Sequence, residues 1–168
     1  MAVPRIQDRL QPALLDRLRD DDPEHMQEPA EARVLSRAKL RDAVLRDLRW
    51  LFNTSCFNSD HQLDAYPHAQ RSVLNFGMPV MSGHTISSID PVLLEARVRQ
   101  AIIDHEPRIL PESLRVEVEM SDIPIEQHNQ ISFRIAGLLW AQPVPLELLL
   151  HTDIDLETGR VDVRELAT

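Results

Sequence analysis

The 168-residue sequence has little cysteine and little glycine. Its single cysteine, Cys56, excludes an internal disulfide framework and fits a reducing compartment. The four glycines are far apart in the sequence, so the glycine-rich loops that bind phosphate groups are missing. They stand at Gly77, Gly83, Gly137 and Gly159.

Long apolar runs and an excess of positive charge are also missing. No stretch of about 18 or more apolar residues occurs, so we expect no insertion into a membrane. The first residues lack the apolar region of a secretory signal, and we expect a cytoplasmic protein. The formal net charge of −9 argues against nucleic acid as a partner. With 43 % hydrophobic and 27 % charged residues, the composition is that of a globular protein.

The charge is distributed unevenly along the chain. Residues 31–50 contain six bases and three acids, a net +3, whereas residues 104–168 contain five bases and thirteen acids, a net −8. Such segregation suits electrostatically matched protein neighbours. A solvated helix face also explains it and is the more common case, and the sequence leaves both interpretations open.

Residues 1–29 read as a flexible N-terminal arm and linker. Their one apolar cluster lies at i, i+4, i+5 and i+8, the spacing of a helix of two or three turns. A helix this short is marginal alone in water, so it needs a surface to lie on, either its own domain or a partner. The cluster consists of Leu10, Leu14, Leu15 and Leu18.

Residues 30–168 are predicted to form one domain that begins with two main helices. A helical pattern runs through 31–52, with Val34 and Ala38 at the start of its apolar stripe. The stretch 53–89 is rich in turn signals. Asp90 and Pro91 then begin a second helix as N-cap and first helical residue, and Pro107 ends it.

The remainder of the chain alternates between apolar and polar residues, as strands do. The segments 114–120 and 130–137 show this pattern, and apolar residues occupy even positions from Leu146. Residues 157–160 then form a turn into a last strand with Val161 and Val163. We therefore predict an α+β fold in which the two helices pack on one face of a small, mainly antiparallel sheet.

A search for catalytic groups finds none. Glu117 and Glu119 on one strand face would lie about 6.6 Å apart at roughly 3.3 Å per residue, but any exposed Glu-x-Glu pair has this spacing. The seven histidines lack metal-ligand spacing, and Ser82 has no nucleophile-elbow context. We expect no catalytic residue, no metal and no cofactor.

Glu106 and Arg108 flank the proline that stops the second helix. Because Pro107 biases Glu106 toward an extended conformation, the side chains at i and i+2 would project together. They would form either a docking knob for another protein or an ion pair inside the domain. The residues alone do not decide between the two.

Several segments in this order resemble the TssE family of type VI secretion baseplates. That family is similar to a contractile-phage baseplate wedge protein once labelled a tail lysozyme. The segments are LLDRL at 14–18, LRDLRWLFNT at 45–54, YPHAQRSVLNFGMPVMSG at 66–83, EPRI at 106–109, LLWAQPVPLELLL at 138–150 and DLETGRV at 155–161.

The resemblance implies a structural subunit that joins wedge partners (TssF, TssG and TssK-like) to sheath proteins (TssB and TssC-like) and templates sheath assembly by strand addition. It implies that Glu106, Pro107 and Arg108 form the family's attachment triplet. It also implies that the arm with Leu14, Leu15 and Leu18 lies on a partner. The alternative function is a peptidoglycan-cleaving, lysozyme-like hydrolase. The expected free sheet edge is the C-terminal hairpin around Gly159.

Overall fold

The computed structural model describes residues 14–18, 36–57, 63, 65–83, 85, 88–119, 130–141 and 144–166. Most of the predicted arm at 1–29 therefore lies outside the described residues. The helical elements are α1 (Leu14–Leu18), α2 (Arg37–Phe52), α3 (Pro67–Gln70), the 3₁₀ turn η2 (Val73–Asn75) and α4 (Pro91–His105). The strands are β1 (Arg115–Glu119), β2 (Gln130–Leu139), β3 (Leu146–Asp155) and β4 (Val161–Glu165).

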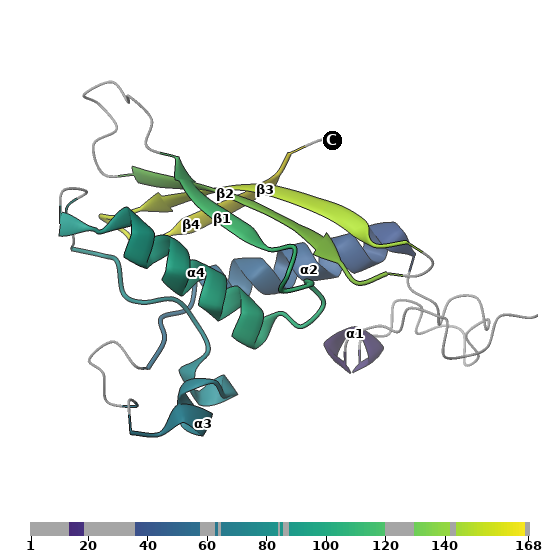
Figure 1. The fold of residues 1–168 in the computed structure, drawn as a ribbon, viewed down its shortest axis with the longest axis horizontal. Coiled ribbons are helices and arrows are strands. Elements are labelled where there is room, and N and C mark those ends of the chain that lie inside the picture. The colour runs from purple at the N-terminus through teal and green to yellow at the C-terminus, as the bar shows by residue number, and fades with distance from the viewer. Residues whose placement is uncertain are drawn as a thin grey trace, which may run out of the picture.

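The four strands form one antiparallel sheet in the order β1-β2-β3-β4. In Figure 1, α2 and α4 both lie on the same side of this sheet, with α4 below β1. Along the chain, the described helices precede the four strands. Consecutive strands can therefore pair antiparallel, without the helical crossovers that parallel strands need. The predicted α+β class is confirmed.

The alternation read from the sequence matches the burial of the strands. Val116 of β1 pairs with Ile135 of β2, and Phe133 pairs with Thr152 of β3, all with side chains turned to the helices. Full burial of an aliphatic or aromatic side chain contributes about 1.5–3 kcal/mol. The other buried strand residues include Ile131, Leu148, Leu150, Ile154, Val161 and Val163.

Helix α2 begins later than its apolar pattern suggests. Ser36 is extended, with φ −68° and ψ 157°, and its hydroxyl accepts a hydrogen bond from the Lys39 N–H at 3.1 Å. The predicted span 31–52 was therefore wrong at its start, because a serine cap competes with continuation of the helix. Ala38 is exposed, and the buried stripe begins at Leu40.

Helix α4 has the expected ends. The Asp90 carboxylate accepts hydrogen bonds from the N–H groups of Val92 at 2.9 Å and Leu93 at 3.3 Å, and Pro91 occupies the first turn. The helix ends at His105, with Glu106 as C-cap. Pro107 cannot donate the next helical hydrogen bond, which explains the stop.

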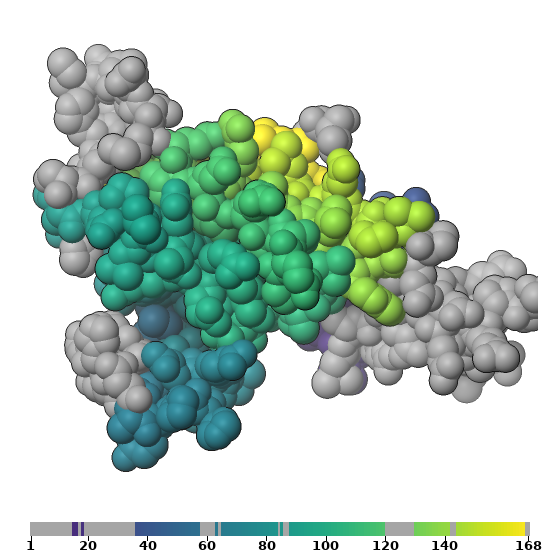
Figure 2. Space-filling view, viewed as in Figure 1, coloured from purple at the N-terminus to yellow at the C-terminus, as the bar shows by residue number. Residues whose placement is uncertain are grey.

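The segment between the two long helices returns to the residues that follow α2, and Gly77 lies at this close approach. Cys56 N–H donates to the Met78 carbonyl at 2.8 Å, and Met78 N–H donates to the Thr54 carbonyl at 2.7 Å. Gly77 has φ +130°, and a Cβ there would overlap Thr54 and come within 2.8 Å of the Cys56 nitrogen. Only glycine fits this close backbone approach. The segment with α3 and η2 protrudes below α4 (Figure 2).

Candidate interaction site at the turn after α4

The turn after α4 is fastened to the end of β2. Ile109 forms an isolated antiparallel bridge with Leu139. Leu110 N–H donates to the Leu138 carbonyl at 2.9 Å, and Trp140 N–H donates to the Arg108 carbonyl at 2.7 Å. Glu106 has φ −125° and ψ 77°, outside the helical region, as a residue before proline should be. The backbone on both sides of Pro107 is therefore held in place.

Glu106 and Arg108 form a two-bonded ion pair across the proline. Arg108 Nε donates to Glu106 Oε1 at 2.6 Å, and Nη2 donates to Oε2 at 2.5 Å. The Arg108 backbone N–H also donates to Oε1 at 3.2 Å. Glu106 is only 3 % exposed, whereas Pro107 is exposed. Of the two arrangements that the sequence left open, the intradomain ion pair is the one present in the structure.

The pair extends to α2 and α1 through further charges. Arg108 Nη2 also donates to Asp47 Oδ2 at 2.5 Å, and Asp47 Oδ1 accepts from Arg46 Nε at 2.9 Å. Arg46 Nη1 donates to Asp16 of α1. Five side chains of alternating charge thus connect three helices. In order they are Glu106, Arg108, Asp47, Arg46 and Asp16.

The two arginines of this charged network, Arg46 and Arg108, remain cations. Burial alone would lower the pKa of Arg108, but the hydrogen bonds and charges of Glu106 and Asp47 outweigh it and raise the pKa. The pKa of Arg46 is raised chiefly by its hydrogen bonds to Asp16 and then to Asp47. Both arginines of the network therefore stay charged when the pH changes within the physiological range.

The arm residues singled out from the sequence lie apart from the triplet. Leu14 begins α1, and Leu15 and Leu18 on the same helix are 49 % and 75 % exposed. The contact between α1 and α2 is made by Asp16, which sequence reasoning missed together with Arg46 and Asp47. The run of bases in 31–50 was a signal that α2 meets acids, but it did not reveal which ones.

The C-terminal hairpin places β4 at the expected edge of the sheet, and the outward backbone groups of Val161 there are bonded to a side chain. The Asn53 side chain donates to the Val161 carbonyl at 2.9 Å and accepts from the Val161 N–H at 3.0 Å. Arg49 Nη2 donates to the Val163 carbonyl at 3.1 Å. β4 is nonetheless an edge strand of the sheet, so the expected edge is present, with side chains from the end of α2 bonded to these outward backbone groups.

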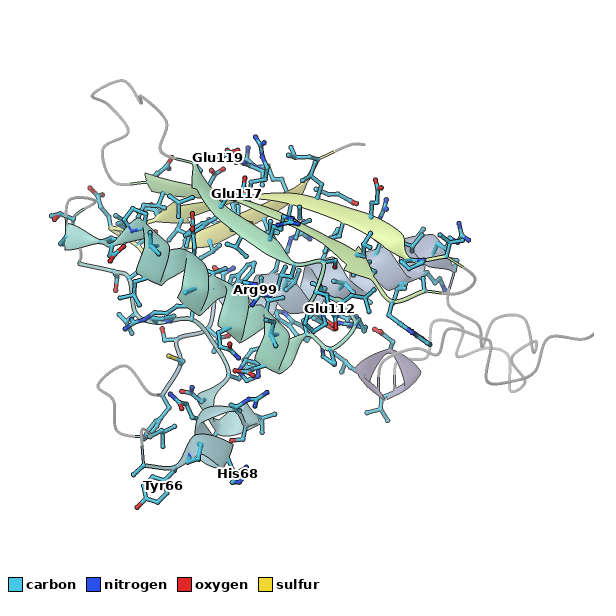
Figure 3. All side chains as sticks on the ribbon, viewed as in Figure 1. Tyr66, His68, Arg99, Glu112, Glu117 and Glu119 are labelled. Carbon is cyan, nitrogen blue, oxygen red and sulfur yellow. The ribbon has the colours of Figure 1, made fainter. Side chains whose placement is uncertain are left out.

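Glu117 and Glu119, the two carboxylates considered from the sequence as a catalytic pair, have different surroundings. Glu119 Oε1 accepts from Arg134 Nη2 at 2.5 Å, and its Oε2 lies 3.3 Å from His151 Nδ1, so both carboxylate oxygens have a side-chain neighbour. Glu117, on the same strand in Figure 3, is exposed. Across the described ranges, no three His, Cys, Asp or Glu side chains cluster as metal ligands would. Within the same ranges, no helix is long and apolar enough to cross a bilayer.

Comparison with protein families identifies the fold's relatives. The model of the family described as "Baseplate wedge protein gp25" matches residues 38–144, which is more than half of the chain. The chain belongs to this family. The matched range includes α2, α4, β1, β2 and the Glu106–Arg108 turn. No curated protein and no solved structure matches the chain.

Membership confirms the baseplate-wedge resemblance read from the sequence. Proteins of this family are structural components of baseplates, and a baseplate wedge protein interacts with other baseplate components. Of the five charged residues from Glu106 to Asp16, all but Asp16 lie within the matched range.

Proposed function

We propose that this chain is a structural subunit of a type VI secretion baseplate wedge in the cytoplasm. It links wedge partners of the TssF, TssG and TssK-like kinds to the TssB and TssC-like sheath proteins, and it helps to start sheath assembly. The observation that carries the proposal is the braced Glu106–Arg108 turn inside the range matched by the wedge family. A turn held on both sides presents a fixed surface, so less conformational entropy is lost on binding.

The three residues of the triplet have different tasks in this proposal. Glu106 is too deeply buried for contact with a partner, so it positions Arg108. The Arg108 side chain is 23 % exposed, and among the described residues no acceptor is bonded to its Nη1. Arg108 Nη1 and the exposed Pro107 ring are therefore the atoms that meet a wedge partner. The half-exposed Trp140, bonded to the Arg108 carbonyl, provides apolar area beside them.

The N-terminal arm gives a second contact in the same proposal. Residues 30–168 form the single domain, and residues 1–29 are the arm and linker. Leu14, Leu15 and Leu18 are the leucines of α1 in the arm, and the exposure of Leu15 and Leu18 leaves them for a partner to cover. Asp16, bonded to Arg46, holds α1, near the middle of this arm, beside α2.

Co-purification with candidate wedge and sheath proteins tests the proposal. The natural chain should retain them, and a Glu106→Ala/Arg108→Ala variant should lose at least one wedge partner. A Glu112→Ala/Arg115→Ala variant is the matched control, because it removes one acid and one base that are exposed next to the same turn. Circular dichroism of all three proteins checks the fold.

The outcomes separate the alternatives. Loss of a partner only in the triplet variant supports the docking role and identifies that partner. If the natural chain captures no wedge or sheath protein, the baseplate role is wrong for this chain. Hydrolysis of peptidoglycan would then be the activity to measure.

A further inference from the structure

Residues 65–77, called the lobe below, contain α3 and η2 and protrude below α4 (Figure 2). Val73 and Leu74 of η2 are adjacent in sequence and are 83 % and 74 % exposed, and Tyr66 is 63 % exposed. Figure 3 shows the Tyr66 side chain pointing away from α4 and the sheet. Single exposed apolar residues are ordinary, but neighbouring ones on a protrusion mark a surface that another molecule covers.

Hydrogen bonds within the lobe give η2 a fixed shape. The Ser72 hydroxyl donates to the Ala69 carbonyl at 2.8 Å and accepts from the Leu74 N–H at 3.3 Å. The Asn75 side chain donates to the Gln70 carbonyl at 2.9 Å, and its backbone N–H donates to the Ser72 carbonyl at 3.0 Å. Because the backbone under the exposed pair is already ordered, little conformational entropy is lost when the pair is covered.

Two contacts fix the lobe to the last turn of α4. Arg71 Nε donates to Asp104 Oδ1 at 2.9 Å. The ring of Phe76 meets the ring of His105 edge-on, with 5.2 Å between the centroids. Glu106 follows directly as the C-cap of α4. The lobe and the braced turn are therefore attached to the same end of one helix, and a protein that docks on the turn meets the lobe at a set position.

The charge of the lobe is positive, although that of the chain is negative. Residues 65–77 include no acid, and the chain as a whole has a net charge of −9. The side chain of Arg71 is 67 % exposed, whereas that of its partner Asp104 is 9 % exposed. The lobe thus presents a cation and attracts carboxylates. A lobe-to-lobe contact between two copies would bring two Arg71 side chains together and is disfavoured.

We propose that Val73 and Leu74 insert into an apolar pocket of a wedge protein, and that carboxylates on the rim of this pocket face Arg71. The proposal rests on the proposed function and adds a contact surface to it. Tyr66 lies at the edge of the contact, where its ring covers apolar surface and its hydroxyl reaches water or the polar rim. An apolar centre with a charged border is the usual anatomy of such an interface.

The affinity for the TssF- and TssG-like proteins tests the exposed pair. Val73→Ala/Leu74→Ala removes the inserted side chains and should weaken binding by roughly thirtyfold or more. Val92→Ala/Leu93→Ala is the matched control, because it removes the same two side chains from exposed positions at the start of α4. The control should change the affinity by less than about twofold. Circular dichroism checks that both variants fold.

Fluorine NMR tests the proposal on the natural sequence. Tyr66 is the single tyrosine of the chain, so incorporation of 3-fluorotyrosine labels the lobe alone. When the wedge protein binds, the resonance should shift and lose its sensitivity to replacement of water by deuterated water, because the partner excludes solvent from the ring. At the same concentrations, the resonance of the Val73→Ala/Leu74→Ala variant should remain that of the free protein.

Four results overturn the assignment. Equal losses of affinity in both pair variants would show a general dependence on exposed apolar surface. Wedge binding that leaves the fluorine resonance unchanged would place the contact elsewhere, while the proposed function stands. A resonance that shifts with the concentration of the chain alone, or with vesicles of phosphatidylcholine and phosphatidylglycerol, would mean that a second copy or a lipid surface covers the lobe. If the natural chain binds no wedge protein, the proposed function fails, and this proposal fails with it.

Discussion

Replacing Glu106 by glutamine isolates the charge of the ion pair from its shape. The amide has nearly the volume of the carboxylate, so the packing around this buried side chain is retained. It offers one oxygen where Arg108 now bonds to two, and its NH₂ group faces one of the two arginine nitrogens. We expect the Glu106→Gln variant to fold but to lose stability.

The magnitude follows from the geometry of the pair. Removing one partner of a buried salt bridge costs about 3–5 kcal/mol. Arg108 keeps Asp47 as a second partner at 2.5 Å and is partly exposed, so water and Asp47 recover part of this cost. We expect a loss of about 2 kcal/mol in the free energy of unfolding. For a protein of this size, that lowers the Tm by about 4–8 °C.

Thermal unfolding at pH 7 measures the effect, with Glu112→Gln as the control for loss of one exposed carboxylate near the same turn. A double-mutant cycle with Arg108→Gln then gives the coupling between the two side chains, for which we expect about 1–3 kcal/mol. A Tm of Glu106→Gln within about 1 °C of the natural chain, together with zero coupling, would refute the brace. The triplet would then have to act by surface contact alone.

Two further predictions concern the sheet. Thr152 is 2 % exposed, and its hydroxyl has no partner among the described residues, so Thr152→Val should raise the free energy of unfolding by about 1 kcal/mol in urea titrations. A lower stability of that variant would mean that the hydroxyl is bonded. The pKa of Asp155 is lowered from 3.8 by the N–H groups of Thr158 and Glu157 and the Thr158 hydroxyl. Its stabilisation is therefore complete above the unfolded value of 3.8 and is lost as the pH falls through the lower folded value. Between pH 2 and pH 4, Asp155→Asn should flatten this part of the stability profile, and an unchanged profile would contradict it.

Local patterns predicted the elements because the forces that set them are local. Asp90 and Pro91 mark a helix start by the hydrogen bonds and φ angle that each residue supplies by itself. The period-two pattern gave the inward positions of the strands for the same reason. The start of α2 was missed where two local signals competed, since Ser36 caps the helix within an otherwise helical pattern.

The candidate site could be predicted only in part because its partners are distant in sequence. Because Pro107 biases Glu106 toward an extended conformation, the side chains of Glu106 and Arg108 were expected to project together. Their ion pair was therefore one of the two arrangements that the sequence left open, beside a docking knob. Asp47 lies 61 positions from Arg108, and the spacing of residues in either segment does not indicate that the two side chains meet. The same holds for Asn53 and Val161, separated by 108 positions. The sequence indicates that β4 is a strand, but it does not indicate which side chains bond to the outward backbone groups of that strand.

Each long helix buries one face in the core and uses side chains on an adjacent face to bond an outer strand of the sheet. In α4, Leu94, Val98 and Ile102 fill the core, while Glu95 and Arg99 on the neighbouring face hold the edge of β1. Any shift of the helix that preserved the core contacts would therefore leave these two side chains in place, and a shift that moved them would disturb the core.

The brace and the β1 edge lie on this same rigid element. Glu106 caps the C-terminal end of α4, and Glu95 stands about three turns earlier on the same helix. A wedge partner that fixes the turn at Arg108 thus also fixes the helix that guards the edge.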